Sequence, residues 1–164
     1  MEITLLENDV TKIETDVLVV NLFEGVTSPA GATGAVDKVI GGLITALISD
    51  GEISGSEGEV TLIHTPSSVY PDLKASRVLV AGLGPNDRID TNAIRRVSAT
   101  VIRKLREVGV KKFATIVHGS GIGGVDVTLC AQSLVEGSIL GAYRFLKYRT
   151  TDTCLLYTSP SPRD

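Results

Sequence analysis

The sequence predicts an α/β domain of three layers, α/β/α, in which a mostly parallel mixed sheet lies between two layers of helices. Short runs rich in Val, Ile and Leu alternate along the chain with longer segments that place apolar residues at helical spacing. One of these runs, residues 16–21, has an unbroken apolar centre rich in β-branched valine, which is typical of a strand buried on both faces. Connecting helices must cover the faces of such a sheet.

The first half of the chain supplies two expected strands and one expected helix. Residues 3–6 form the first strand and residues 16–21 the second. Residues 24–34 form a loop rich in Gly, Ser and Pro, and a single helix follows it until residues 49–51 stop it. The apolar positions that predict this helix are Val36, Val39, Ile40, Leu43, Ile44 and Leu47.

Two more strands are expected at residues 59–64 and 77–82, separated by a loop that contains Pro and Ser. Asp90 or Thr91 caps the next helix, which ends near Gly109. The apolar face of this helix consists of Ile94, Val97, Val101, Ile102 and Leu105.

A further strand is expected at residues 113–118, and Asp126 caps a last helix that runs to about Tyr148. Gly137 and Gly141 lie within this helix, where glycine costs about 1 kcal/mol relative to alanine. We therefore expect them to permit close approach to the sheet or to a neighbouring helix.

Composition indicates one folded domain, expected at residues 1–149. The chain has 164 residues, of which 43% are hydrophobic and 21% charged, so it can bury a core. Residues 150–164 lack an amphipathic period and close on two prolines, which predicts disorder at their end. This tail resembles translated sequencing-adaptor read-through, and it is expected to be non-native and to mark a truncated gene.

Charge and cysteine usage exclude several classes of function. The net charge of -3 gives no general attraction to nucleic acid or to anionic lipid. The basic stretch between Arg95 and Lys112 has helical spacing and is interpreted as a solvated helix face. No export signal or membrane span is recognised, and Cys130 and Cys154 make neither a disulfide framework nor a metal site. A cytoplasmic location is expected.

Two glycine-rich segments are candidates for ligand binding. Residues 119–124 spell G-x-G-x-x-G after an expected strand, but the acidic residue of a dinucleotide-binding unit is missing at the end of a following strand. A tight turn is therefore favoured at Gly119, Gly121 and Gly124. The segment with Gly82 and Gly84 also follows a strand and lacks the Lys-Ser/Thr ending of a P-loop, so a turn is favoured there too.

The two histidines, His64 and His118, each end an expected strand. Neither has a second histidine at helical spacing or a cluster of Cys, Asp or Glu beside it in the sequence. We interpret both as hydrogen-bonding residues at strand ends. The sequence therefore nominates no catalytic residue and no metal ligand.

The run from Asn8 to Asn21, followed by residues 34–37, resembles the opening of macro domains. This resemblance implies that Asp9 and Asn21 face ADP-ribose and that residues 119–124 form the later phosphate loop. Leu22, Phe23 and Glu24 stand where that family has small residues and a second Asn.

The chain more closely resembles the N-terminal domain of leucyl aminopeptidases, which shares the macro-like fold. The segments that carry this resemblance are residues 47–55, 58–66, 75–84 and, most specifically, 136–148. The resemblance implies that a C-terminal catalytic domain holds two divalent ions, Zn or Mn, for peptide hydrolysis. It also implies a homo-oligomer. This chain alone is then expected to be inactive and to hold no cofactor, packing instead against its own catalytic domain.

Two hypotheses follow. The first is a non-catalytic N-terminal domain of a di-metal leucyl aminopeptidase, which releases N-terminal amino acids from peptides. The alternative is a stand-alone macro-type module that binds ADP-ribose or a related nucleotide. A Rossmann half-domain, based on the glycine spacing alone, ranks last.

Overall fold

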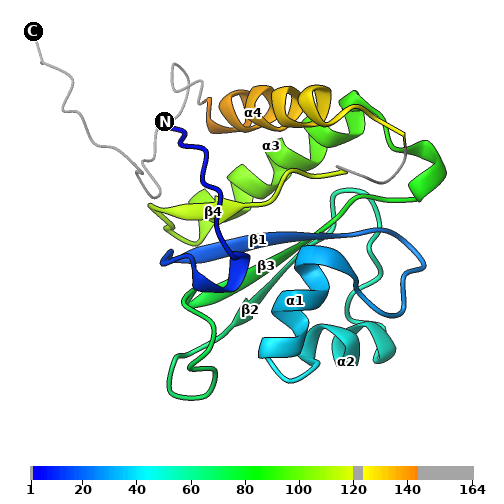
Figure 1. The fold of residues 1–164 in the computed structure, drawn as a ribbon. Helices are drawn as coiled ribbons and strands as arrows, with labels where there is room; N and C mark the ends of the chain where they lie inside the picture. Colours follow the sequence, from blue (N-terminus) through cyan, green and yellow to red (C-terminus); the bar gives the residue numbers. More distant parts are fainter. Residues whose placement is uncertain (1, 120–123, 144–164) are drawn as a thin grey trace, which may run out of the picture.

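Strand β1 (Val17–Leu22) lies inside the sheet and runs parallel to both of its neighbours, β3 (Arg77–Gly82) and β4 (Phe113–Thr115). Strand β2 (Val60–His64) pairs antiparallel with β3, so the order is β2-β3-β1-β4 (Figure 1). The structure is a computed structural model that describes residues 2–119 and 124–143. The predicted mostly parallel mixed sheet is confirmed.

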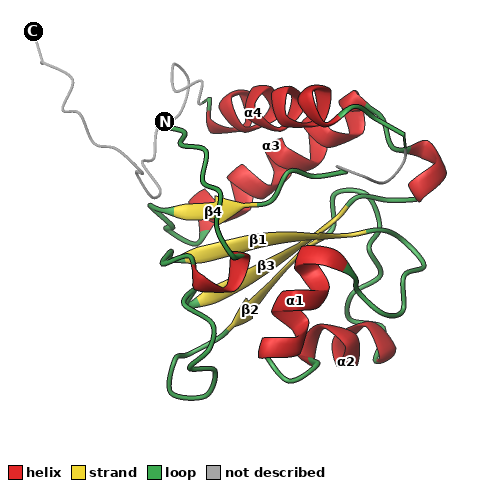
Figure 2. Cartoon of the chain, viewed as in Figure 1, coloured by secondary structure: helices red, strands yellow, loops and turns green. Residues whose placement is uncertain are grey.

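Two apolar cores lie on opposite faces of this sheet, because successive side chains of a strand point to opposite faces. Val17 and Val19 belong to the core that contains α3 (Thr91–Glu107) and Cys130 of α4 (Val127–Ala142). Leu18 and Val20 belong to the core beneath α1 (Gly31–Val39) and α2 (Leu43–Ser49). Figure 2 shows these helices on the two sides of the sheet. The predicted three-layer α/β/α architecture is confirmed.

The single helix predicted through residues 36–47 is wrong, because the structure breaks it into α1 and α2. Gly41 and Gly42 adopt φ angles of +70° and +80°, which a right-handed helix does not contain. The two helices meet at 104°. The apolar spacing continues across the break because both helices pack on the same core. Periodicity therefore located the buried face but not the bend.

Asp37 holds the corner between α1 and α2. Its buried carboxylate accepts hydrogen bonds from the backbone N–H of Ile44 at 2.7 Å and of Thr45 at 3.3 Å, and from the Thr45 hydroxyl at 2.6 Å. These groups lie at the amino end of α2, where backbone N–H groups have no partner within the helix. Asp37 thus caps α2 from the preceding helix.

Replacing Asp37 with alanine is expected to lower the free energy of unfolding by about 2 kcal/mol, because the buried donors at the α2 terminus lose their acceptor. Asp37→Asn keeps one carbonyl oxygen in place and should recover part of the loss. Urea denaturation of the two variants checks this. Equal stability of Asp37→Ala and the unmodified chain would show that water satisfies the corner.

Helices α3 and α4 begin where the sequence predicts. The Asp90 carboxylate accepts from the N–H of Ala93, and the Asp126 carboxylate accepts from the N–H groups of Thr128 and Leu129. Helix α4 ends at Ala142, and the rest of its predicted extent lies outside the described residues.

Gly137 and Gly141 bring α4 onto α3. A Cβ atom at Gly141 would lie 2.6 Å from the Cα of Ala99, and one at Gly137 would meet the backbone of Arg95. The predicted close approach is confirmed. The sequence left open whether the sheet or a neighbouring helix would be approached, and the structure shows that it is the helix α3.

Two strand predictions are corrected. Residues 3–6 form no strand, and Ile3, Leu5 and Leu6 are exposed, because this segment makes no ladder with the described strands. The strand predicted at 113–118 spans only Phe113–Thr115, since beyond it the backbone keeps a single bond to β1, from the N–H of Ile116 to the carbonyl of Val19 at 3.4 Å. Residues 150–164 lie outside the described part, so the tail stays a prediction.

No single helix among the described residues is both long and apolar enough to cross a membrane, although the bent pair α1 and α2 meets the length and composition criteria together.

Candidate functional site

Four of the candidate residues lie at one edge of the sheet. Because β1, β3 and β4 are parallel, their carboxyl ends meet there, and ligands of open α/β sheets usually bind at this edge. Asn21 is near the end of β1, Gly82 ends β3, Gly84 follows it, and Gly119 follows the β4 segment. The structure thus brings together residues separated by up to about 100 positions, as the parallel connections require.

Asp9 lies at the opposite edge. It caps a short 3-10 helix, η1 (Val10–Lys12), that precedes β1, and the carbonyl of Thr11 in this helix accepts from Lys74, which precedes β3. The Asp9 carboxylate accepts from the backbone N–H and the hydroxyl of Thr11 at 2.9 and 2.8 Å. These bonds lower the pKa of Asp9. The length of β1 therefore separates Asp9 from Asn21.

His118 is the buried polar group at the carboxyl edge. Its Nδ1 lies 3.4 Å from the side-chain Nδ2 of Asn21, and only 1% of the residue is exposed. Since an amide nitrogen only donates, Nδ1 acts as the acceptor, which places the proton of the neutral ring on Nε2. Burial lowers the pKa of His118 to about 4. At neutral pH this pair is an uncharged internal contact.

Asn21 is also fixed through its backbone. Its carbonyl oxygen accepts from the Thr33 hydroxyl at 2.7 Å, which ties the end of β1 to α1. Sequence reasoning placed Asn21 and His118 at strand ends separately. Their pairing could not be read from the sequence, because it depends on the register of β1 and β4.

The backbone of Gly82 and Gly84 is occupied by the protein itself. The N–H of Gly82 donates to the carbonyl of Glu59 at 2.8 Å, and that of Gly84 donates to Gly55 at 2.9 Å. The N–H of Leu83 between them donates to Leu22 at 2.8 Å. A Cβ at Gly82 would also collide with the backbone of Gly55 and Ser56. These donors form a packed turn and are not available to a phosphate.

The later glycine loop is described only at its two ends. Gly119 is buried with φ +76°, and a Cβ there would lie 3.4 Å from the side chains of Ile89 and Ile94. Gly124 is exposed with φ +71° and has open space around it. Gly121 lies outside the described residues.

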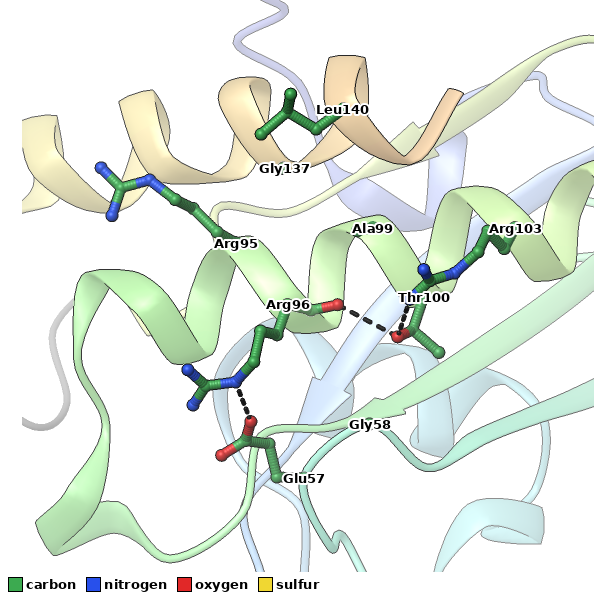
Figure 3. Close-up of a pocket in the computed structure, with 9 residues that line it drawn as sticks. All are labelled: Glu57, Gly58, Arg95, Arg96, Ala99, Thr100, Arg103, Gly137 and Leu140. Carbon is green, nitrogen blue, oxygen red and sulfur yellow. Dashed lines mark hydrogen bonds and ion pairs between the residues drawn. The ribbon is translucent and has the colours of Figure 1, made fainter. Parts of the chain in front are cut away.

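Sequence reasoning did not anticipate a groove of about 460 Å³ between α3, α4 and the loop at Glu57 (Figure 3). Two of its arginines are engaged: Arg95 pairs with Glu136 at 2.6 Å and Arg96 pairs with Glu57 at 2.7 Å. Arg103 donates to the Thr100 hydroxyl at 3.0 Å. The only sign of this groove in the sequence was the helical spacing of its arginines, which was interpreted as a solvated helix face. In the structure these arginines line the groove together with an apolar residue, Leu140.

The remaining chemistry-bearing residues are dispersed. Cys130 is buried, and its burial raises the pKa of the thiol. Across the described ranges, no three His, Cys, Asp or Glu side chains come close enough together to hold a metal ion. This part of the chain therefore offers packing surfaces and a neutral buried pair.

Comparisons with known proteins identify relatives. Residues 19–152 match the family described as the cytosol aminopeptidase family, N-terminal domain. A probable cytosol aminopeptidase of Alkaliphilus oremlandii is 30% identical over 152 residues, which cover 93% of this chain and 30% of that protein. The chain spans about a third or less of the length of the first curated relatives that it matches.

Solved structures agree on the fold. A tomato leucine aminopeptidase mutant has a TM-score of 0.70 at 15% identity, over 94% of this chain and 32% of that one. The macrodomain of Mycobacterium tuberculosis DarG has a TM-score of 0.67 at 20% identity, over 84% of this chain and 90% of that one. The predicted macro-like fold is confirmed. At these low sequence identities the two comparisons show a similar fold and nothing about function.

Proposed function

The chain belongs to the N-terminal domain family of the cytosol aminopeptidases, and from this premise we propose that it is the non-catalytic domain of a metal-dependent leucyl aminopeptidase. In this proposal it packs against a catalytic domain of the same protein and contributes to a homo-oligomer in the cytoplasm. The parent enzyme releases N-terminal amino acids from peptides.

One observation carries the proposal: the relatives match nearly all of this chain, while the chain spans only about 30% of their length. The groups at the sheet edge where β1, β3 and β4 end also support the proposal. There the donors of Gly82 and Gly84 bond within the protein, and His118 is neutral and buried. A supporting domain needs packed turns of this kind and no reactive group.

The two divalent ions expected of the parent enzyme, Zn or Mn, do not fit among the described residues, because no set of three suitable side chains converges there. No catalytic step is therefore assigned to this chain. In the proposal the ions lie in the part of the parent protein beyond this domain.

An ADP-ribose module on the same scaffold would need backbone donors directed at a ligand. The described turn at residues 82–84 directs its N–H groups into the protein, and Asp9 lies at the other edge of the sheet. These contacts favour the supporting role over nucleotide binding.

The proposal is tested on the uninterrupted parent gene, recovered from the source genome. The full-length protein, supplied with Mn²⁺, is expected to accelerate leucyl-p-nitroanilide hydrolysis by about a millionfold or more over the uncatalysed rate. The 164-residue chain under the same conditions should give only the buffer rate, since the described part holds no metal site.

Absorbance of released nitroaniline measures both rates, and gel filtration reports the assembly state of the full-length protein. A reading frame that stops soon after Tyr148, or hydrolysis by the short chain itself, would contradict the proposal.

A further inference from the structure

Helix α4 has two different sides. The side toward α3 carries small residues such as Gly137 and Gly141, which let the two backbones approach closely. Outside this contact, α4 and the residue that follows it carry large apolar residues that are exposed, here called the α4 apolar face: Leu129 (48%), Ile139 (53%), Leu140 (68%) and Tyr143 (73%). Single exposed apolar residues are normal, but three of these four gather at the carboxyl end of α4: Ile139 and Leu140 in its last turns and Tyr143 directly after it.

The border of the α4 apolar face is charged. Leu140 lines the groove that also contains Arg95, Arg96 and Arg103 of α3 (Figure 3). Glu136 on α4 accepts from Gln132 at 2.7 Å and from Arg95 at 2.6 Å, which lowers its pKa. An apolar surface that includes a tyrosine and is bordered by arginine is the usual composition of a protein interface.

The position of this face indicates its occupant. α4 is the last helix of the described part, while about 70% of the length of an aminopeptidase relative lies outside the part that this chain matches. A region that continues from the end of α4 is tethered next to the α4 apolar face, so its effective concentration there is high. At this border Arg95 and Arg96 are already paired with carboxylates of the domain, whereas Arg103 donates to a neutral hydroxyl, so its charge favours a surface that presents a carboxylate beside its apolar residues.

We propose that the α4 apolar face, together with Arg103, is the surface on which the catalytic domain of the parent aminopeptidase docks. This inference rests on the proposed function and adds the location of the contact. The partner surface is apolar opposite Leu140 and Tyr143 and acidic opposite Arg103.

Cysteine labelling tests the contact without depending on a destabilising change. Leu140→Cys is introduced into both the 164-residue chain and the full-length parent protein, and maleimide labelling of that peptide is followed by mass spectrometry. Labelling is expected to be about tenfold or more slower in the full-length protein, because docking buries the thiol. Val69→Cys is the control: Val69 is 61% exposed in the β2–β3 loop, so its labelling rate should be the same in both proteins.

Equal labelling rates for Leu140→Cys in the two proteins would overturn the docking surface while leaving the proposed function intact if the full-length protein is active. A parent gene without a catalytic region would overturn both. Arg103→Glu in the full-length protein adds an independent readout, since reversing the border charge should speed labelling of Leu140→Cys and leave that of Val69→Cys unchanged.

Discussion

Replacing Gly137 with leucine is expected to lower the free energy of unfolding by more than about 3 kcal/mol, as overpacking of a tight contact does. A Cβ at this position would already meet the carbonyl of Arg95, and the Arg95 Cα would lie only 2.7 Å away. Backbone atoms cannot rotate aside, so α4 would have to move off α3. The gain in helix propensity, about 1 kcal/mol, is too small to compensate.

The matched control is Ala142→Leu, which adds the same side chain to an exposed position of the same helix. Its free energy of unfolding should stay within about 0.5 kcal/mol of the unmodified chain. Guanidinium denaturation followed by circular dichroism compares the two. Similar stabilities for Gly137→Leu and Ala142→Leu would show that α4 shifts freely on α3, and the tight helix pair would then not be what positions the α4 apolar face.

The same contact shows how far sequence reasoning reaches. Two glycines inside an otherwise apolar helix predicted a close approach, because glycine is disfavoured there unless something needs the space. That the neighbour is α3 could not be predicted, because it depends on how α4 is oriented in the folded domain, and no local sequence pattern determines this. Conversely, Gly41 and Gly42 were available in the sequence as a signal for the break after α1, but the continuous apolar spacing outweighed them.

The candidate site divides in the same way. The apolar runs that precede Asn21 and Gly82 were enough to place both residues at strand ends. Asp9 was grouped with Asn21 by resemblance to another family, whereas in this fold it caps η1 at the far edge. The use of the N–H groups at residues 82–84 could not be predicted, because their acceptors are distant in the sequence, at the end of β1 and in the loop before β2.

Acidification is expected to destabilise the protein through His118. Its pKa is about 4 in the folded chain, because burial disfavours the charged ring, and about 6.5 in an unfolded chain. Between these values the unfolded state binds more protons, so the free energy of unfolding rises with pH across this window and falls as pH is lowered. The full effect of one such histidine is about 3 kcal/mol between pH 7 and pH 4.

His118→Gln should remove this dependence, because glutamine does not titrate and its carbonyl can still accept from the Nδ2 of Asn21. Carboxylates that titrate in the same range act equally in both proteins, so the difference between their urea midpoints at pH 4 and pH 7 isolates His118. His64→Gln is the matched control for the substitution itself, because it makes the same change of side chain at an exposed position. An equal loss of stability on acidification in His118→Gln and the unmodified chain would contradict this prediction. It would mean that the His118 ring is protonated in the folded protein and that water reaches this edge of the sheet.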